Sequence, residues 1–531
     1  MVLYYIAVGC FYAALIASCV LNFHHYMHMF QLNSYHAGEQ FKWIKDNLLH
    51  VICRHIFTVI SAVLLIIALS PQDYKLSSSM LIFAAAVGMT MNINSLAYGH
   101  KKVKKKLVYT PRVIRMAVTS AIIYAAVLTL TAVFCGFSMV TMSVACGMQI
   151  LTAFIVMIAN LINKPIEHGV NMHYINEAKA IIDGLPFLTV VGLTGSYGKT
   201  STKFFLEKLL GAKYNVLMTP ESYNTTMGVV KTIRGSLKAT HEIFLCEMGA
   251  KGVGEIKEIC DIVKPKYGVI TSIGPQHLET FKSVENIINT KFELADSLPE
   301  DGIAFLNYDN EYIKGRGYKR DKVTYGLSGD GEDYYADNIT VNENGTHFTL
   351  HHGEESKEFT TKLIGEHNVQ NIVGAIATAN TLGVELDALV LPVRRLESVP
   401  HRLQIIKRGK DIVIDDAFNS NPSGAKAALD TLAVFDGYKI LISPGMVELG
   451  EKEYELNKNF GKQAAAVCDY VIAVGEKQAV PIKDGLLEAG YPEDKIFVAK
   501  TLDVALKQAD SLKTGGKKKI MLLENDLPDN Y

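Results

Sequence analysis

The chain has 531 residues, with 53 basic and 54 acidic side chains and a formal net charge of -1, so there is room for three or four domains. This balance gives no sign of nucleic-acid binding, and the eight scattered cysteines form no CxxC pair, which argues against zinc and dithiol motifs and for reduced thiols. The acids are unevenly placed, because only Glu39, Asp46 and Asp73 precede Leu161.

The first part of the chain contains five apolar stretches, each long enough to cross a bilayer, which takes about 20 residues. They are apolar on all sides and nearly free of charge, which favours a membrane domain over a soluble bundle. A removable signal peptide is not expected, since the first stretch lacks a basic start and four more follow it. We expect a transmembrane domain over residues 1–165, with spans at Val2–Leu21, Val51–Ser70, Ser79–Tyr98, Met116–Phe134 and Met139–Ile162.

The loops between these stretches predict the orientation in the membrane. Lys101–Arg115 carries seven basic residues and no acid, and Leu21–His50 carries two lysines. The loops Pro71–Leu76 and Cys135–Ser138 are nearly neutral. The positive-inside rule therefore puts both basic loops in the cytoplasm. We expect a multi-pass protein of the cytoplasmic membrane with its N-terminus outside and everything after the last span in the cytoplasm.

The cytoplasmic loop before His50 is rich in histidine and contains Trp43, the only tryptophan. His24 and His28 have the i, i+4 spacing of metal ligands on a helix, but no carboxylate or thiol completes a set. An interfacial helix with Trp43 at headgroup level is the alternative. A contact for an anionic lipid headgroup is a third possibility that the sequence leaves open.

The segment Val191–Thr202 lies between an apolar run typical of a buried strand and a stretch with helical periodicity. Gly195 and Gly198 allow the backbone to close around an anion. Lys199 supplies positive charge for phosphates, and the Thr200 hydroxyl can hold Mg²⁺. The full Walker pattern has one more glycine, so this segment is a variant of the P-loop.

Strand-like and helix-like segments alternate from Leu188 to about Tyr325, which predicts a mostly parallel, doubly wound sheet. Glu247 and His277 each follow one of the predicted strands. Carboxyl ends of parallel strands form the ligand-binding edge of such sheets, so these two side chains could complete a Mg²⁺ shell begun by Thr200 and ATP. By default, Lys291 is expected to be a solvated helix lysine.

The remaining segments suggest the rest of the architecture. The polar, alternating stretch 326–361 predicts a small antiparallel insertion, and 367–382 predicts a helix. A second α/β pattern begins after Pro400. The expected fold is an N-terminal all-α membrane domain, a P-loop doubly wound central domain over 180–396, and a smaller Rossmann-like α/β domain over 397–531.

A set of short motifs runs through the cytoplasmic part. They are Thr194-Gly-Ser-Tyr-Gly-Lys-Thr-Ser-Thr202, Asn224-Thr-Thr-Met-Gly228, Glu247-Met-Gly-Ala250, Ile273-Gly-Pro-Gln-His-Leu-Glu279, Leu306-Asn-Tyr-Asp309, Gly365-Glu-His-Asn-Val-Gln-Asn371, His401-Arg-Leu403, Ile414-Asp-Asp-Ala-Phe-Asn-Ser-Asn-Pro422 and Gly445-Met-Val-Glu-Leu-Gly450. In this order they resemble the Mur peptide ligase family, most closely its member that adds D-alanyl-D-alanine. The last 80 residues fit the family only by pattern.

The resemblance implies an ATP-dependent acid–amino-acid ligase that forms ADP and works with Mg²⁺. Lys199, Glu247, His277 and Lys291 would be catalytic. Thr200 and Glu247 would bind one Mg²⁺ and His277 a second, while Lys291 matches a lysine that the family carbamylates into a metal ligand. The implied ATP-binding residues are Thr194, Gly195, Ser196, Tyr197, Gly198, Lys199, Thr200, Ser201, Asn224, His367, Asn368, Asn371, Arg402 and Asp416.

Two departures from the family affect the expected substrates. Family members of this type begin with a soluble domain that holds the UDP end of a nucleotide-sugar peptide, whereas this chain begins with membrane spans. A lipid-linked acceptor held by the spans would explain the exchange. The family's Lys-Gly-Ser-type turn is replaced by Glu524–Tyr531, which leaves the incoming amine open and suggests a cationic one.

The leading hypothesis is a membrane-anchored ligase that joins an amino acid or dipeptide to a peptide-bearing envelope precursor, with membrane lipid as its other partner. One alternative is a ligase that builds a poly-amino-acid such as polyglutamate. Another is a P-loop ATPase coupled to the spans, although no span shows an obvious buried ion pair or charged relay. A degenerate ligase acting as a scaffold is disfavoured because Lys199, Glu247, His277 and Lys291 are present.

Overall fold

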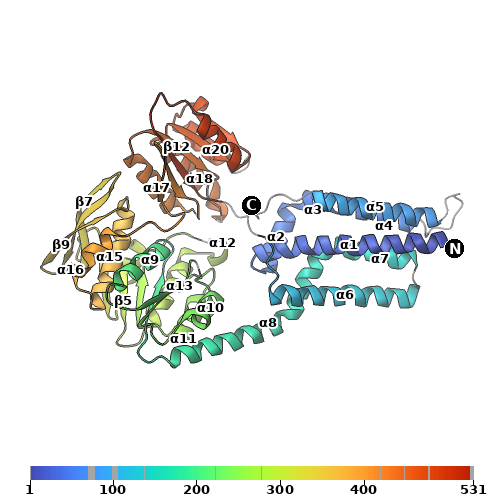
Figure 1. The fold of residues 1–531 in the computed structure, drawn as a ribbon, viewed down its shortest axis with the longest axis horizontal. Helices are drawn as coiled ribbons and strands as arrows, with labels where there is room; N and C mark the ends of the chain where they lie inside the picture. Colours follow the sequence, from blue (N-terminus) through green and yellow to red (C-terminus); the bar gives the residue numbers. More distant parts are fainter. Residues whose placement is uncertain are drawn as a thin grey trace. The chain divides into compact units, whose positions relative to one another are not determined.

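The computed structural model describes residues 2–67, 69, 78–98, 106–136, 138–221, 223–276, 278–418, 420–447, 449–475 and 479–526. The chain divides into two compact units, one up to Met172 and one from His173 onwards. The first unit is helical throughout (Figure 1). Its helices are α1 (Val2–Leu32), α2 (Ala37–Asp46), α3 (Leu48–Arg54), α4 (Ile56–Ile67), α5 (Ser78–Tyr98), α6 (Pro111–Cys135), α7 (Met139–Ile150) and α8 (Thr152–Asp183), the last of which continues into the second unit.

Among the described residues, two helices are long and apolar enough to cross a membrane, Tyr4–Leu32 in α1 and Pro111–Cys135 in α6. Two bent pairs, α3 with α4 (53°) and α7 with α8 (74°), raise the number to four if each pair is one span. In α5, the part whose side chains are described is the apolar segment Met80–Ile93. Over their described residues, the five expected spans are therefore mainly helical, and in that part of the chain two to four helices or bent pairs are long and apolar enough to cross. The neutral loop Pro71–Leu76 and the lysine run 101–105 both lie outside the described residues, so the orientation in the membrane stays a prediction.

The expected cytoplasmic loop after Leu21 is mostly helical, because α1 continues to Leu32 and α2 and α3 follow. The reason is packing, since Met27 and Phe30 of α1 are buried against Met116 of α6. The histidine-rich stretch that was expected in a loop therefore begins on α1, and Trp43 lies on α2.

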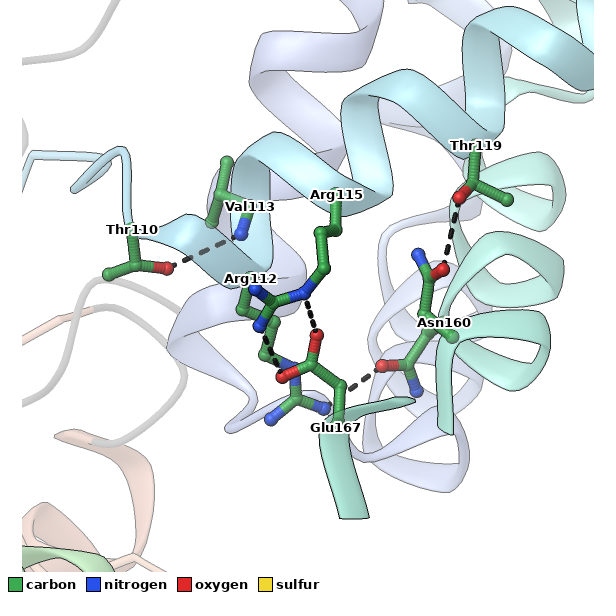
Figure 2. A network of polar contacts seen from close by, with 8 residues as sticks. Thr110, Arg112, Val113, Arg115, Thr119, Asn160 and Glu167 are labelled. Carbon is green, nitrogen blue, oxygen red and sulfur yellow. Dashed lines mark hydrogen bonds and ion pairs between the residues drawn. The ribbon is translucent and has the colours of Figure 1, made fainter. Parts of the chain in front are cut away.

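Polar side chains tie α6 to α8 (Figure 2). Arg115 donates from Nε and Nη2 to the two carboxylate oxygens of Glu167 over 2.7 and 2.9 Å. Arg112 donates to Asn160 over 2.9 Å, and Thr119 donates to Asn163 over 3.0 Å. This ion pair joins Arg115, just before the fourth expected span, to Glu167, just after the fifth, so it lies outside the expected spans.

The second unit begins with a nine-stranded sheet in the order β2-β3-β1-β4-β5-β6-β7-β8-β9. Neighbours pair in parallel from β2 to β7 and antiparallel from β7 to β9. The predicted antiparallel insertion therefore extends the main sheet. The strands are β1 (Thr189–Thr194), β2 (Val216–Met218), β3 (Ile243–Glu247), β4 (Tyr267–Ile270), β5 (Ile303–Asn307), β6 (Lys322–Gly326), β7 (Tyr334–Asn342), β8 (Gly345–His352) and β9 (Glu355–Thr361).

Helices cover both faces of this sheet, as expected for a doubly wound fold. Val191 and Leu193 of β1 pack into one buried cluster with α9 and α15, whereas Val190 packs into another with α10 and α11. Successive strand residues point to opposite faces, so a strand covered on both sides is apolar throughout. The helices are α9 (Lys199–Leu210), α10 (Thr226–Ser236), α11 (Glu255–Val263), α12 (Leu278–Phe281), α13 (Val284–Asp296), α14 (Glu311–Arg316), α15 (Glu366–Thr381) and α16 (Leu386–Arg394).

A six-stranded sheet follows, in the order β10-β11-β15-β12-β13-β14, with only β10 antiparallel to its neighbour. The last strand, β15, lies between β11 and β12, so the chain returns to the middle of the sheet. The elements are β10 (Gln404–Arg408), β11 (Asp411–Asp416), α17 (Pro422–Val434), β12 (Tyr438–Ser443), α18 (Glu453–Ala465), β13 (Tyr470–Val474), α19 (Ala479–Glu488), β14 (Ile496–Ala499), α20 (Leu502–Ser511) and β15 (Lys519–Glu524).

Candidate active site

The glycine loop joins the end of β1 to the start of α9, and both of its predicted glycines have positive φ. Gly195 has φ 150°, and a Cβ there would lie 2.2 Å from Thr271 Oγ1. Gly198 has φ 80°, and a Cβ there would lie 2.5 Å from Asn371 Oδ1. Both positions therefore require glycine, as expected for a loop that closes around an anion.

The loop is held against the segment that follows β4. Ser196 N donates to the Ser272 carbonyl over 2.6 Å, and the Tyr197 hydroxyl donates to the Pro275 carbonyl over 2.9 Å. The Ser196 hydroxyl donates to the Gly274 carbonyl over 3.0 Å. This segment leads directly to His277, which lies outside the described residues, so the metal-binding role of His277 stays a prediction.

Lys199 starts α9 and folds back over the loop. Its Nζ donates to the carbonyls of Gly195 (2.6 Å) and Ser196 (3.1 Å). Desolvation lowers the Lys199 pKa to about 8, against the opposing attraction of Glu247. Of the other predicted loop residues, Ser201 lies in the first turn of α9, and the Thr194 hydroxyl donates to the Met248 carbonyl over 2.9 Å, which ties β1 to the end of β3.

Glu247, at the carboxyl end of β3, is the centre of the site. Its Oε1 accepts hydrogen bonds from Thr200 Oγ1 (3.1 Å) and Asn224 Nδ2 (3.0 Å). Lys203 Nζ lies 2.9 Å from Oε2, and the two side chains of this ion pair are 0% and 1% exposed. Burial raises the pKa of Glu247, but the attraction of Lys203 and Lys199 outweighs it and lowers the pKa below its usual value. The carboxylate is therefore ionised at neutral pH.

Lys203 is a site residue that none of the sequence motifs indicated. It lies one helical turn after Lys199, and this i, i+4 spacing is the signal that could have indicated a second cation near the loop. Its side chain, however, points into the protein and pairs with Glu247, while its Nζ also donates to the Glu221 carbonyl over 2.6 Å.

Thr200 and Glu247 fit a magnesium ion. Both offer hard oxygen ligands, and Glu247 Oε2 accepts no well-aligned hydrogen bond despite the nearby lysine. Magnesium in nucleotide sites takes one or two protein ligands and completes its shell with phosphates and water. Among the described residues, which exclude His277, no three His, Cys, Asp or Glu side chains converge, so this pair is the described part of any metal site.

Lys291 lies on α13 and is only 3% exposed, so the default expectation of a solvated lysine is wrong. Burial, together with the nearby charge of Lys199, lowers its pKa to about 7. A substantial fraction of its amine is therefore uncharged at neutral pH, which is the form that reacts with carbon dioxide.

Helix α15 brings Asn371 against the P-loop. Its Oδ1 accepts a hydrogen bond from Thr202 of α9 over 3.2 Å and lies beside Gly198. His367, one turn earlier, has a buried Nε2 that makes no hydrogen bond, and desolvation lowers its pKa to about 4. Asn368 instead bonds its own turn, donating to the Ile364 carbonyl over 2.9 Å. Of the three residues predicted on this helix, Asn371 therefore lies beside the P-loop, and His367 has a buried nitrogen that is free to bond a ligand.

Arg402 reaches the site from the segment that precedes β10. Its Nη2 donates to Thr200 Oγ1 over 3.4 Å, and its guanidinium lies 4.4 Å from the centre of the Phe418 ring. Its neighbours His401 and Leu403 both have positive φ, at 60° and 50°. Such strained conformations in residues other than glycine persist where surrounding structure enforces them, and here they orient Arg402.

Asp416 lies further into the second sheet. Its Oδ1 accepts a hydrogen bond from the Leu403 amide over 3.1 Å. Burial and the neighbouring carboxyl group of Glu524 raise its pKa to about 8. Glu524 is fully buried and accepts hydrogen bonds from Ser443 (2.5 Å) and Ser420. Glu524 is therefore held inside the second sheet, and because residues 527–531 lie outside the described part of the chain, the preference for a cationic amine stays a prediction.

Comparison with known proteins identifies this arrangement. The model of the Mur ligase middle domain matches residues 193–379, and that of the Mur ligase glutamate ligase domain matches residues 401–522. The UDP-N-acetylmuramoyl-tripeptide–D-alanyl-D-alanine ligase of Escherichia coli K12 is 30% identical over 341 residues, which span 63% of this chain and 75% of that enzyme. The Bacillus subtilis 168 enzyme of the same name is 34% identical over 275 residues, 51% of this chain and 59% of that enzyme.

Solved structures give the same result. MurF from Thermotoga maritima in complex with ADP superposes with a TM-score of 0.60 at 26% identity, covering 67% of this chain and 80% of that chain. A MurF structure from Acinetobacter baumannii gives 0.61 at 27% identity, covering 67% and 78%. The two family models match only after residue 192, within the second unit.

Proposed function

The chain belongs to the Mur ligase family of ATP-dependent amide ligases, and we propose that it joins the amine of an amino acid or dipeptide to a peptide carboxylate on a membrane-held cell-envelope precursor. One observation carries the proposal. Thr200 of the P-loop, Glu247 of β3 and Arg402 from the second-sheet segment meet through direct hydrogen bonds. Residues from three distant parts of the chain thus converge where the phosphates of ATP would lie.

The proposed reaction begins when a peptide carboxylate oxygen attacks the γ-phosphate of ATP, giving an acyl phosphate and ADP. The amine then attacks the acyl carbon, and phosphate leaves. Lys199 and the loop amides would hold the β- and γ-phosphates, and Arg402 would neutralise charge on the transferred group. Such fixed cations and dipoles stabilise the transition state without reorganising during the reaction.

Thr200 and Glu247 are the described residues that would hold Mg²⁺, which would supply charge neutralisation of the phosphates. Lys203 keeps Glu247 ionised and therefore able to act as a ligand. Lys291, with an amine that is partly uncharged at neutral pH, is suited to carbamylation, as the family resemblance implies. His277 would complete the set.

The first unit supports a membrane location for this chemistry. Its apolar helices would anchor the ligase domains, which we assign to residues 180–396 and 397–531, at the cytoplasmic face. Since the two Mur ligase models match only after residue 192, the spans could replace a soluble substrate-holding domain. We therefore propose a lipid-linked acceptor. The enzymes that resemble this chain act, by their names, on a UDP-linked tripeptide and D-alanyl-D-alanine.

The test is phosphate release by the detergent-purified protein with either membrane lipid extract or soluble UDP-linked peptides as acceptor and a panel of amino acids and dipeptides. Mass spectrometry identifies the product. Turnover that needs both the lipid fraction and an amine supports the proposal, and turnover with the soluble acceptor alone contradicts the lipid link. Lys199→Ala should abolish turnover, whereas Lys208→Ala, on the exposed side of α9, should not. A ladder of products would favour a poly-amino-acid ligase. ATP hydrolysis that needs neither substrate would favour an ATPase coupled to the spans.

A further inference from the structure

Among its described residues, the first unit contains an arginine that makes no ion pair, Arg54. The described carboxylates of this unit are Glu39 and Asp46, both exposed on α2, and Glu167, which pairs with Arg115. Arg54, at the end of α3, forms an ion pair with none of them. A buried guanidinium without a carboxylate partner is costly unless another group neutralises its charge. The described residues of this unit therefore do not supply the group that would neutralise Arg54.

The pair in Figure 2 provides the contrast. Glu167 accepts two hydrogen bonds from Arg115, an arrangement that neutralises the charge and fixes α6 to α8. Bidentate pairing of this kind leaves little capacity for a further anion. Arg54, by comparison, makes one neutral hydrogen bond, from its Nε to Asn22 Oδ1 over 3.0 Å.

Two donors beside that bond are unsatisfied. Arg54 Nη2 and Asn22 Nδ2 are both buried and make no hydrogen bond, and Asn22 is 0% exposed. Because Nε of Arg54 bonds Oδ1 of Asn22, covalent geometry keeps the two free donors within a few ångströms of each other. A guanidinium N–H and an amide N–H on two such neighbouring side chains are donors of the kind that phosphate oxygens accept from.

A second contact fixes the position of Arg54. Tyr26, one turn after Asn22 on α1, bonds through its hydroxyl to Nε2 of His55, the residue that follows Arg54, over 2.8 Å. Asn22 and Tyr26 therefore hold the junction of α3 and α4 at two points. The free donors are positioned by the fold, so a ligand would not have to order them.

The depth of the pair suits a lipid headgroup. Asn22 is 20 residues after the start of α1, which is about 30 Å along a helix and equals the thickness of the hydrocarbon core. If α1 crosses the membrane from its first residue, Asn22 and Arg54 lie at the opposite boundary, where lipid phosphates are found. The adjacent α3 exposes Leu49 (76%) and Ile52 (55%), which gives an apolar surface for the lipid chain.

We propose that Arg54 and Asn22 bind the phosphate of a membrane lipid, the chemical class that includes a lipid-linked acceptor. The inference deepens the proposed function and rests on it for that last identification, while the phosphate site itself rests on the uncompensated arginine.

The experiment uses the full chain in phosphatidylcholine nanodiscs and measures the fluorescence of Trp43, which packs in the same cluster as Tyr26. The discs contain phosphatidylcholine alone or with a polyprenyl phosphate or phosphatidic acid, and inorganic phosphate is added to a separate sample. We expect saturable binding of the lipid phosphates. Arg54→Gln and Asn22→Asp should each weaken lipid binding about tenfold to a hundredfold. Arg54→Gln removes a charge-assisted hydrogen bond, whereas Asn22→Asp blocks the site with an internal carboxylate.

Lys45→Gln, which removes an exposed cation of α2, is the matched control and should leave affinity unchanged. Asn22→Asp should unfold at or above the temperature of the parent protein, because its carboxylate pairs with Arg54, so lost binding cannot be attributed to misfolding. Equal binding by Asn22→Asp and the parent, or equal affinity for inorganic phosphate and the lipids, overturns the site. Arg54-dependent lipid binding without ligation of a lipid-linked acceptor would contradict the proposed function and leave the site standing.

Discussion

The buried ion pair between Lys203 and Glu247 offers a sharp test of how the active site is held together. In Lys203→Met, Glu247 loses its partner at 2.9 Å, and the Glu221 carbonyl loses a hydrogen bond of 2.6 Å. The two side chains are 0% and 1% exposed, so water cannot replace the ammonium. Breaking a buried pair by removing one partner costs about 3–5 kcal/mol, because the other charge is left uncompensated.

The assay is hydrogen exchange of the full-length protein in detergent, followed by mass spectrometry of peptides from β3 and α9. A loss of about 3–5 kcal/mol speeds exchange through local or global opening by about a hundredfold to several thousandfold. The matched control is Lys208→Met, on the same helix, whose lysine side chain is 67% exposed and whose loss should cost no more than about 0.5 kcal/mol.

A double variant separates the pair from simple loss of packing. In Lys203→Met with Glu247→Gln, both charges of the pair are removed together, so the combined loss should be smaller than the sum of the single losses by about 1–3 kcal/mol. Additive losses, or exchange in Lys203→Met no faster than in Lys208→Met, would refute the reasoning.

Three further predictions concern the same site. Gly198→Ala should lower ATP affinity at least about tenfold in calorimetry, because its Cβ would meet Asn371 Oδ1 at 2.5 Å with φ at 80°, whereas Gly235→Ala, with open space around it, should not. If Lys291 is carbamylated, bicarbonate-dependent ATP turnover should rise as pH increases through about 7, where the amine loses its proton, and Lys291→Arg should abolish it; a flat profile would count against the carbamate. His367 has a folded pKa of about 4 against 6.5 unfolded, so only the unfolded chain binds a proton between these values, and stability should fall as pH drops from 6.5 to 4; His367→Asn should flatten that slope in thermal unfolding.

Local patterns in the sequence were sufficient for the glycine loop and for most strands. A strand, a glycine turn and a helix in succession leave few conformations that close around an anion, and both glycines have the positive φ that this requires. The length and uniform apolarity of the stretches before residue 165 also predicted helices there, because a helix in contact with lipid is apolar on every side. The apolar pattern did not predict the full length of α1, because that helix continues past Leu21 and packs Met27 and Phe30 against α6.

What the sequence determined by itself is the chemistry that lies in consecutive residues: the P-loop with Lys199 and Thr200, the apolar stretches, and the family motifs. The tertiary structure alone decided which distant residues meet. It placed β15 between β11 and β12, paired Lys203 with Glu247, buried Lys291 and gave Arg54 an asparagine as its hydrogen-bond partner. The physical reason is that periodicity reports which face of an element is buried, whereas the partner of a buried charge depends on packing between elements far apart in the chain.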